Sequence, residues 1–228
     1  MLNTLANDPT RTTTLWRYMA DEAKRRFNWL KKKIEEAVRD INIFGLERSK
    51  WKTVTSAELD FLIPNQFQYL SDADKIKQFN QILKTYERAG LFSVGDSVIN
   101  RSGIAFTTWQ DGFLEQAYIR GFNRTVAELK RMGYSIPKLE VSNYFGYTFH
   151  RSALEVIFTR AYDQLEGITA AMSQQMSLVM ADGLMAGYTA DVIAEELAKK
   201  VDGIGLTRAK LLARTEISYS YNIAALEE

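Results

Sequence analysis

Residues 152–186 have the sequence SALEVIFTRAYDQLEGITAAMSQQMSLVMADGLMA, and this stretch decides the fold. Its apolar side chains recur at steps of three or four residues, which is the spacing of one face of an α-helix. We therefore predict a single long helix that Gly187 caps at its end. The apolar stripe consists of Leu154, Ile157, Phe158, Ala161, Leu165, Ile168, Met172, Met176 and Val179.

Methionines are frequent in the second half of this helix. We interpret them as packing residues, because flexible methionine side chains fill irregular gaps in a core; a promiscuous binding surface is the alternative interpretation. The residues concerned are Met172, Met176, Met180 and Met185.

The same periodicity occurs on both sides of the long helix. The whole chain has only three prolines, and it is rich in residues that favour helices. The expected fold class is therefore mainly α, built from long amphipathic helices. Further helices are predicted over residues 13–43, 72–89, 109–132, 190–200 and 206–226.

Two short stretches interrupt the helical pattern. The β-favouring runs 97–99 and 104–107 flank a turn-prone segment, 100–103, and together they predict a small β-hairpin. Near the C-terminus, residues 202–205 are too few for anything but a tight turn between two helices. We therefore expect a C-terminal helix-hairpin-helix-like corner there.

We divide the chain into an N-terminal helical region, residues 1–91, and a second helical domain, residues 92–228. The apolar stripe of residues 13–43 is wider than one small domain can cover, so this helix is expected to pack against a partner or another copy of the chain. The helical pattern reaches Glu228 without a cap, so we expect the second domain to be truncated at its C-terminus. Fraying of the last turn is the alternative.

The composition excludes several classes of protein. The 228 residues carry a net charge of +1 and contain no cysteine, which rules out disulfides and thiolate metal sites. No stretch resembles a signal peptide or a membrane span, and we expect no contact with a membrane.

Enzyme signatures are weak. The single histidine, His150, provides no histidine metal cluster and no relay, and the aspartates are scattered without pairing. The glycines at 203 and 205 lack the third glycine of a dinucleotide fingerprint. We therefore predict no catalytic residue, no cofactor and no metal, and we expect that the chain is not an enzyme. A nuclease whose acids meet only in the folded protein is the alternative.

The corner near the C-terminus is a candidate DNA-binding element. In a helix-hairpin-helix motif, two glycines form a tight turn, and the N–H groups that begin the next helix hold a phosphate. Basic residues beside that turn add positive charge. The alternative is an ordinary corner in which glycine only lets two helices pack closely. The candidate residues are Gly203, Ile204, Gly205, Thr207, Arg208 and Lys210.

A second motif overlaps this corner. The run Ala213-Arg214-Thr215-Glu216 is preceded by Arg208-Ala209 and followed by small residues and Asn222. Two elements precede this run, an aromatic helix around residues 113–122 and then the long helix. The order and spacing of these elements are similar to those of a known family. Together these elements, over residues 109–228, resemble the phage Mu protein F-like minor head proteins, also called the phage head morphogenesis family.

The resemblance implies a low-copy virion protein of a tailed bacteriophage. Such a protein acts at the portal or capsid interior in procapsid assembly, DNA packaging or ejection. Its expected partners are portal and capsid proteins, further copies of itself on the portal ring, and packaged double-stranded DNA. It is expected in the head interior or at the portal vertex, and in the host cytoplasm during assembly. Region 1–91 is then the portal-contacting part.

The resemblance implies no catalytic residue, and the polar stretch that commonly follows the family signature is absent from this chain. The alternative function is a DNA-binding module without sequence specificity, which acts through the predicted hairpin and independently of phage assembly.

The charged residues of the signature need partners other than each other. Arg214 and Glu216 lie two residues apart, so on a helix they point in different directions. We predict that Arg214 bonds to Asn222 and that Glu216 bonds to Arg208 or Lys210. These bonds would hold the last helix in place, which makes the role of the signature structural.

Overall fold

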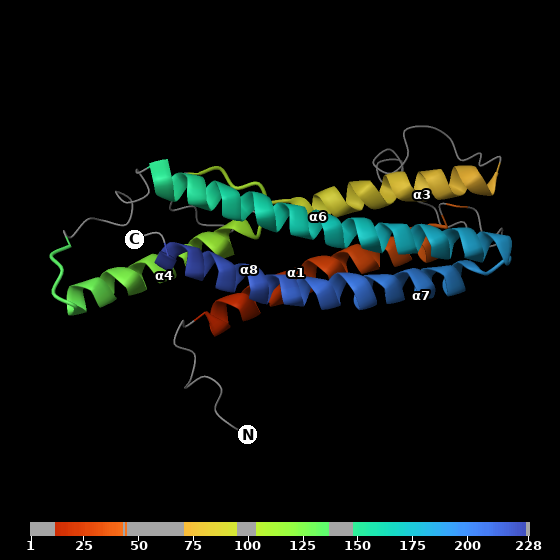
Figure 1. The fold of residues 1–228 in the computed structure, drawn as a ribbon. Helices are drawn as coiled ribbons and strands as arrows, with labels where there is room; N and C mark the ends of the chain where they lie inside the picture. Colours follow the sequence, from red (N-terminus) through yellow and green to blue (C-terminus); the bar gives the residue numbers. More distant parts are fainter. Residues whose placement is uncertain (1–11, 43, 45–70, 95–103, 137–147, 227–228) are drawn as a thin grey trace, which may run out of the picture. The chain divides into compact units, whose positions relative to one another are not determined.

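The computed structural model describes residues 12–42, 44, 71–94, 104–136 and 148–226, and its regular elements are all helical (Figure 1). The expected mainly α fold is therefore confirmed. The α-helices are α1 (Thr13–Glu35), α3 (Asp72–Glu87), α4 (Asp111–Arg131), α6 (Thr148–Met185), α7 (Ala190–Lys200) and α8 (Thr207–Leu226). The π-helical segments are η1 (Glu36–Asp40), η2 (Arg88–Phe92) and η3 (Val201–Leu206).

The long helix has the predicted position. Helix α6 runs for 38 residues, and the chain leaves it through Gly187, whose φ of 68° lies in the left-handed region that glycine adopts without strain. Helix α7 then starts at the predicted cap, because the Thr189 side chain accepts a hydrogen bond from the Val192 N–H. Local residues alone therefore predict both the end of α6 and the start of α7.

The β-hairpin prediction is not supported. Residues 97–99 lie outside the described part of the chain, and residues 104–107 form no strand. Thr107 and Thr108 instead lie just before helix α4, and their N–H and hydroxyl groups all donate to the carboxylate of Asp111, the first residue of that helix, at 2.6–3.0 Å. The Thr108 hydroxyl also accepts from the N–H of Gln110, the residue that precedes the helix. The backbone N–H groups of Thr107 and Thr108, which a strand would use for pairing, thus bond to Asp111 at the start of α4.

The helix-hairpin-helix-like corner is also wrong. Segment η3 joins α7 to α8 with helical backbone, since both its flanking residues, Lys200 and Thr207, are in the right-handed helical region. Neither Gly203 nor Gly205 has a positive φ. The glycines lie within the wider π-type turns of η3, and the chain does not reverse direction there. The sequence pattern alone is compatible with either a turn or a helix.

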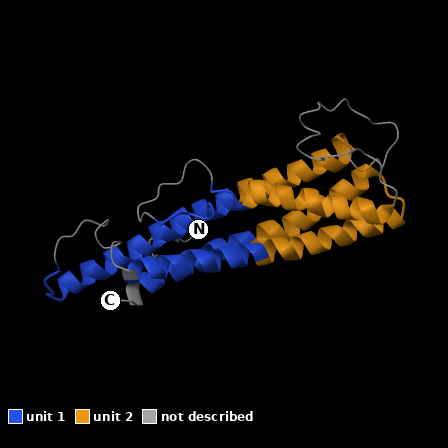
Figure 2. Ribbon diagram, turned by 90° about the horizontal axis from the view of Figure 1, so that it is seen from above, with its two compact units in different colours: residues 1–23, 92–166, 209–228 blue, residues 24–91, 167–208 orange. Residues whose placement is uncertain are grey.

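The chain forms two compact units, and each combines segments that are distant in the sequence (Figure 2). Unit 1 comprises residues 1–23, 92–166 and 209–228, and unit 2 comprises residues 24–91 and 167–208. The division predicted at residue 91 falls at a boundary between units, but neither sequential region corresponds to one unit. Helices α1, α6 and α8 each contribute residues to both units.

The core of unit 1 is formed by the inner faces of α4, α6 and α8 and by the first part of α1, where Leu15, Met19 and Ala23 are buried. Helix α4 packs closely on α8, because a Cβ built on Gly121 would overlap the carbonyl oxygen of Tyr221. Each fully buried large apolar side chain contributes roughly 1.5–3 kcal/mol through its removal from water. The most completely buried include Leu114, Ala117 and Tyr118 of α4, Leu154, Ile157 and Ala161 of α6, and Ala213 and Ile217 of α8.

In unit 2, the methionines of α6 occupy the core. Met172, Met176 and Met180 have no exposed surface, which confirms their interpretation as packing residues, whereas Met185 is 85% exposed and that part of the prediction is wrong. Met185 is the last residue of α6, where the helix ends at the turn to α7. The core also contains Phe27 and Leu30 of α1, Leu83 of α3, and Ile193 and Leu197 of α7.

The segment η2 extends α3 past Gly90, where the sequence predicted a stop. The reason lies in packing within unit 2. A Cβ built on Gly90 would overlap the ring of Trp29, and Arg26 Nη1 donates a hydrogen bond to the Gly90 carbonyl at 2.8 Å. The glycine therefore allows a close approach of η2 to α1 rather than ending the helix.

Candidate functional site

The predicted site residues all lie on one run of helix. Gly203, Ile204 and Gly205 lie in η3, and Thr207, Arg208 and Lys210 form the first turn of α8. The signature residues Ala213–Glu216 follow in the middle of α8, with Asn222 near its end. The residues of both predicted motifs therefore lie in η3 and α8.

The two glycines of η3 have different environments within unit 2. Gly203 faces open space, whereas Gly205 is buried against α1: a Cβ built on it would lie 2.6 Å from the ring of Phe27 and 3.2 Å from the Met172 sulfur. Gly205 is thus required for the close approach of η3 to Phe27. This matches the alternative interpretation of the glycines, in which they serve packing rather than a phosphate.

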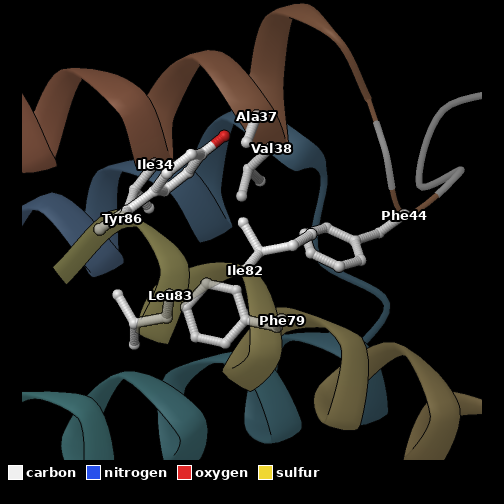
Figure 3. Close-up of a pocket in the computed structure, with 8 residues that line it drawn as sticks. All are labelled: Ile34, Ala37, Val38, Phe44, Phe79, Ile82, Leu83 and Tyr86. Carbon is white, nitrogen blue, oxygen red and sulfur yellow. The ribbon is translucent and has the colours of Figure 1, made fainter. Parts of the chain in front are cut away.

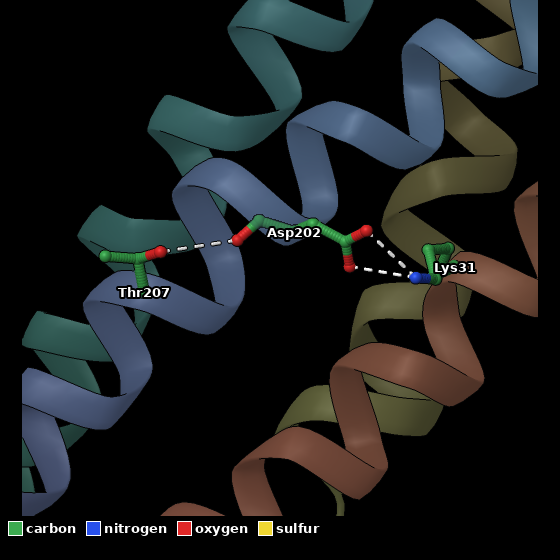
Figure 4. Close-up of polar contacts among 3 residues, drawn as sticks. All are labelled: Lys31, Asp202 and Thr207. Carbon is green, nitrogen blue, oxygen red and sulfur yellow. Dashed lines mark hydrogen bonds and ion pairs between the residues drawn. The ribbon is translucent and has the colours of Figure 1, made fainter.

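The polar groups of η3 are already bonded (Figure 4). The Asp202 carboxylate accepts from Lys31 Nζ at 2.9 and 3.0 Å, and the Thr207 hydroxyl donates to the Asp202 carbonyl at 3.4 Å. The Thr207 N–H donates to the Ile204 carbonyl. The segment therefore does not offer a phosphate the free N–H groups of a helix-hairpin-helix motif. The negatively charged carboxylate of Asp202 also lies in this segment.

The signature on α8 has an inward part. Ala213 and Glu216 are each 1% exposed, and the Glu216 carboxylate accepts from Arg160 Nε of α6 at 3.1 and 3.3 Å. The Arg160 guanidinium lies over the ring of Tyr219, 4.1 Å from its centroid. Burial raises the pKa of the Glu216 carboxyl, and Arg160 opposes that shift. Glu216 thus ties α8 to α6 inside unit 1.

The partners predicted for these residues are wrong. Arg208 lies eight residues before Glu216, which separates their backbones by about 12 Å along α8, and Lys210 is about 9 Å away. The same distance of about 12 Å separates Arg214 from Asn222, and both are exposed. The spacing of these residues on one helix therefore excludes all three predicted pairs. The actual partner, Arg160, could not be predicted from the sequence because it lies on a different helix.

The outward part of α8 is cationic. Arg208, Lys210 and Arg214 are exposed, and the helix's single carboxylate, Glu216, is buried and paired. Leu211 lies between these cations and is 65% exposed. This combination of charge and apolar surface on α8 is the candidate site for an interaction.

No family model matches the chain, and no curated protein or solved structure matches it.

Two other buried polar residues of unit 1, Asp111 and His150, have structural partners. Asp111 is fully buried, and burial raises its pKa while its hydrogen bonds to Thr108 and Thr107 oppose the shift. His150 lies with Nδ1 2.8 Å from the Tyr118 hydroxyl, and burial lowers its pKa. The spacing Thr-x-x-Asp at 108–111 is visible in the sequence and indicates a helix start, but no prediction was based on it.

Among the described residues of unit 2, Glu87 is a buried carboxyl with a shifted pKa. Glu87 of α3 is 8% exposed and accepts a hydrogen bond from the Ser173 hydroxyl of α6. Burial raises its pKa to about 7, and the hydrogen bond from Ser173 and the charge of Lys84 lower it. Ser177 donates in the same way to Asn80, at 2.6 Å, so the two serines and their partners join α6 to α3.

Neither described hollow resembles a ligand site. In unit 2, a void of about 10 Å³ is enclosed by eight side chains, among them Phe44, Phe79 and Tyr86 (Figure 3). It is apolar and no larger than a water molecule needs, so we expect it to be dry. In unit 1, the outer face of α6 has an open hollow of about 460 Å³ at Val156 and Arg160.

Neither a metal site nor a membrane-spanning helix is present among the described residues. They contain no group of three or more histidine, cysteine, aspartate or glutamate side chains that could hold a metal ion. None of the helices formed by these residues is both long and apolar enough to cross a membrane.

Proposed function

We propose that this chain is a minor head protein of a tailed bacteriophage, which binds portal or capsid proteins during procapsid assembly, DNA packaging or ejection. The proposal rests on the resemblance of residues 109–228 to that family. The observation that carries it is the division of the signature on α8: Ala213 and Glu216 face inward and hold the helix, whereas Arg214 and Thr215 are exposed.

Assembly is favoured over catalysis by what the buried polar groups do. The carboxylates of Asp111, Glu87 and Glu216 each bond to a neighbouring side chain that fixes a helix. Each of these bonds therefore has a structural role within its unit. The exposed surface of α8 is then the part available to another molecule.

The proposal is tested by co-expression with the portal protein of the same phage. We expect the full chain to co-purify with the portal ring, and we expect purified virions to contain it in few copies. A portal gene directly upstream of this one would support the proposal. Absence of the chain from virions, together with no association with portal or capsid proteins, would show that it is wrong.

The second candidate, a DNA-binding module, is supported only by the exposed cations Arg208 and Lys210, because the predicted hairpin is not formed. It requires salt-dependent binding of double-stranded DNA by the isolated chain. The variant Arg208→Glu with Lys210→Glu should then abolish binding. Portal association that survives this double substitution favours the first candidate.

A further inference from the structure

The outer face of α8 in unit 1 is formed by Lys210, Leu211, Arg214 and Ser218, and we name it the α8 outer face. All four side chains are exposed. At about 100° per residue they occupy an arc of roughly 100°, so they point the same way from the helix. The rest of the helix circumference includes the side used in folding, where Leu212, Ala213, Glu216 and Ile217 are buried.

The charges of this face are not neutralised within the described part of the chain. Neither Lys210 nor Arg214 forms a hydrogen bond or ion pair with a described residue. Some other cations do pair: the exposed Lys199 pairs with Glu196 at 2.7 Å, and the half-buried Lys31 pairs with Asp202 at 2.9 Å. The α8 outer face therefore attracts negative charge, although the chain as a whole carries only +1.

The leucine decides between two kinds of negatively charged partner. Leu211 is 65% exposed and lies next to Lys210 on the helix. Phosphates of a nucleic acid gain nothing from an aliphatic side chain, because they are recognised by charge and hydrogen bonds. A protein surface gains both ways, since carboxylates pair with the cations while an apolar hollow removes the leucine from water.

We infer that the α8 outer face binds an acidic, amphipathic segment of another protein, with carboxylates placed beside an apolar contact for Leu211. The inference rests on the proposed function, because it names the chemistry of the partner that the signature helix meets. Arg214 pairs with a partner carboxylate through its planar guanidinium, and Lys210 adds a second charge contact. Ser218 extends the polar rim along the same face.

Binding is tested with the full chain and three probes at low ionic strength. The first is a fluorescent amphipathic helical peptide of Glu, Leu and Ala, the second is the same peptide with Gln in place of Glu, and the third is a double-stranded DNA oligonucleotide. We expect the acidic peptide to bind more tightly than the other two probes. Added salt should weaken its binding because exposed charges are screened.

The variants separate the contributions of charge and apolar contact. Lys210→Glu with Arg214→Glu should weaken binding of the acidic peptide by about tenfold, and Leu211→Ser should weaken it severalfold. Lys130→Glu, an exposed residue on α4 of the same unit, is the matched control and should leave binding unchanged. All four positions are exposed, so circular dichroism should show the same helix content for every variant.

In the binding measurements with the peptides and DNA, two results overturn the inference. One is no preference for the acidic peptide, or no effect of the charge reversals on its binding. The other is tighter binding of DNA with no effect of Leu211→Ser, which identifies the face as a nucleic-acid contact. Failure of the proposed function is distinguishable: peptide binding would persist while portal and capsid proteins fail to associate. Portal association that is insensitive to the charge reversals overturns the inference alone.

Discussion

Arg214 and Glu216 show how two neighbouring charged residues acquire opposite roles. Both belong to the same four-residue signature, but Glu216 turns into unit 1 and meets Arg160, whereas Arg214 is exposed. The sequence correctly indicates that the two do not pair with each other, since they lie two residues apart on a helix. It does not reveal which one is buried, because that depends on the helix packed against α8.

The first prediction separates these roles by stability. Glu216→Ala should lower the free energy of unfolding by about 1–3 kcal/mol, because it removes a buried bond to α6. Arg160→Ala should cost more, since it leaves the Glu216 carboxylate buried without its partner. Arg214→Ala, at an exposed position, should change stability by less than about 0.5 kcal/mol. Denaturant unfolding measures all three, and a cost at Arg214 equal to that at Glu216 contradicts this assignment.

The second prediction concerns the pKa of Glu87, which burial raises from an ordinary value of 4.5 to about 7. Its folded form holds the proton more tightly than the unfolded chain does. The stabilisation by that proton is complete below about pH 4.5 and is lost as the pH rises through about 7. Glu87→Gln keeps the acceptor for Ser173 but removes the charge. It should raise the free energy of unfolding at pH 8.5 by up to about 3 kcal/mol.

The same substitution should have little effect on stability at pH 4.5, so the comparison between the two pH values is internally controlled. Glu195→Gln, at an exposed carboxylate on α7, serves as the matched control and should leave the pH dependence unchanged. Equal effects of Glu87→Gln at both pH values would mean that Glu87 does not carry the proton.

At the scale of the elements, helix positions could be predicted and helix partners could not. The apolar stripe of residues 152–186 and the cap at Thr189 depend on local spacing, so they predict α6 and the start of α7 correctly. The segment η3 depends on contact with Phe27, which lies far away in the sequence. Gly-x-Gly is compatible with both a tight turn and a helix, and only the packed neighbour decides between them.

The third prediction uses the two glycines of η3. Gly203→Ala should raise the free energy of unfolding by about 0.5–1 kcal/mol, because the position is helical and open, and alanine restricts the unfolded chain. Gly205→Ala should lower it by about 1–3 kcal/mol, because the added methyl group meets the ring of Phe27. A helix-hairpin-helix turn predicts destabilisation at both positions, so a stability loss for Gly203→Ala would favour that motif.

At the scale of the whole molecule, the two units do not follow the order of the sequence. Unit 2 needs residues 24–91 and 167–208, and unit 1 needs three separate segments. The sequence predicts a division at residue 91 because the helical pattern is interrupted there. Sequence order cannot show that later helices return to cover α1 and α3.

The fourth prediction follows from this interleaving. A fragment of residues 92–228 lacks α1 and α3, so the buried methionines of α6 and the apolar face of α7 lose their cover. We expect the fragment to unfold without a cooperative transition and to be cut rapidly by proteases, unlike the full chain. Thermal melting followed by circular dichroism tests this expectation. A sharp transition in the fragment would identify residues 92–228 as an independent domain.

The interleaved units also affect how the chain is synthesised. Phe27 leaves the ribosome early, but Gly205, against which it packs, follows 178 residues later. At roughly 5–20 residues per second, this delay is about 9–36 s. During that time the apolar face of α1 is exposed on a nascent chain. Efficient production in the cell should therefore depend on chaperones that hold the first helix until translation is almost finished.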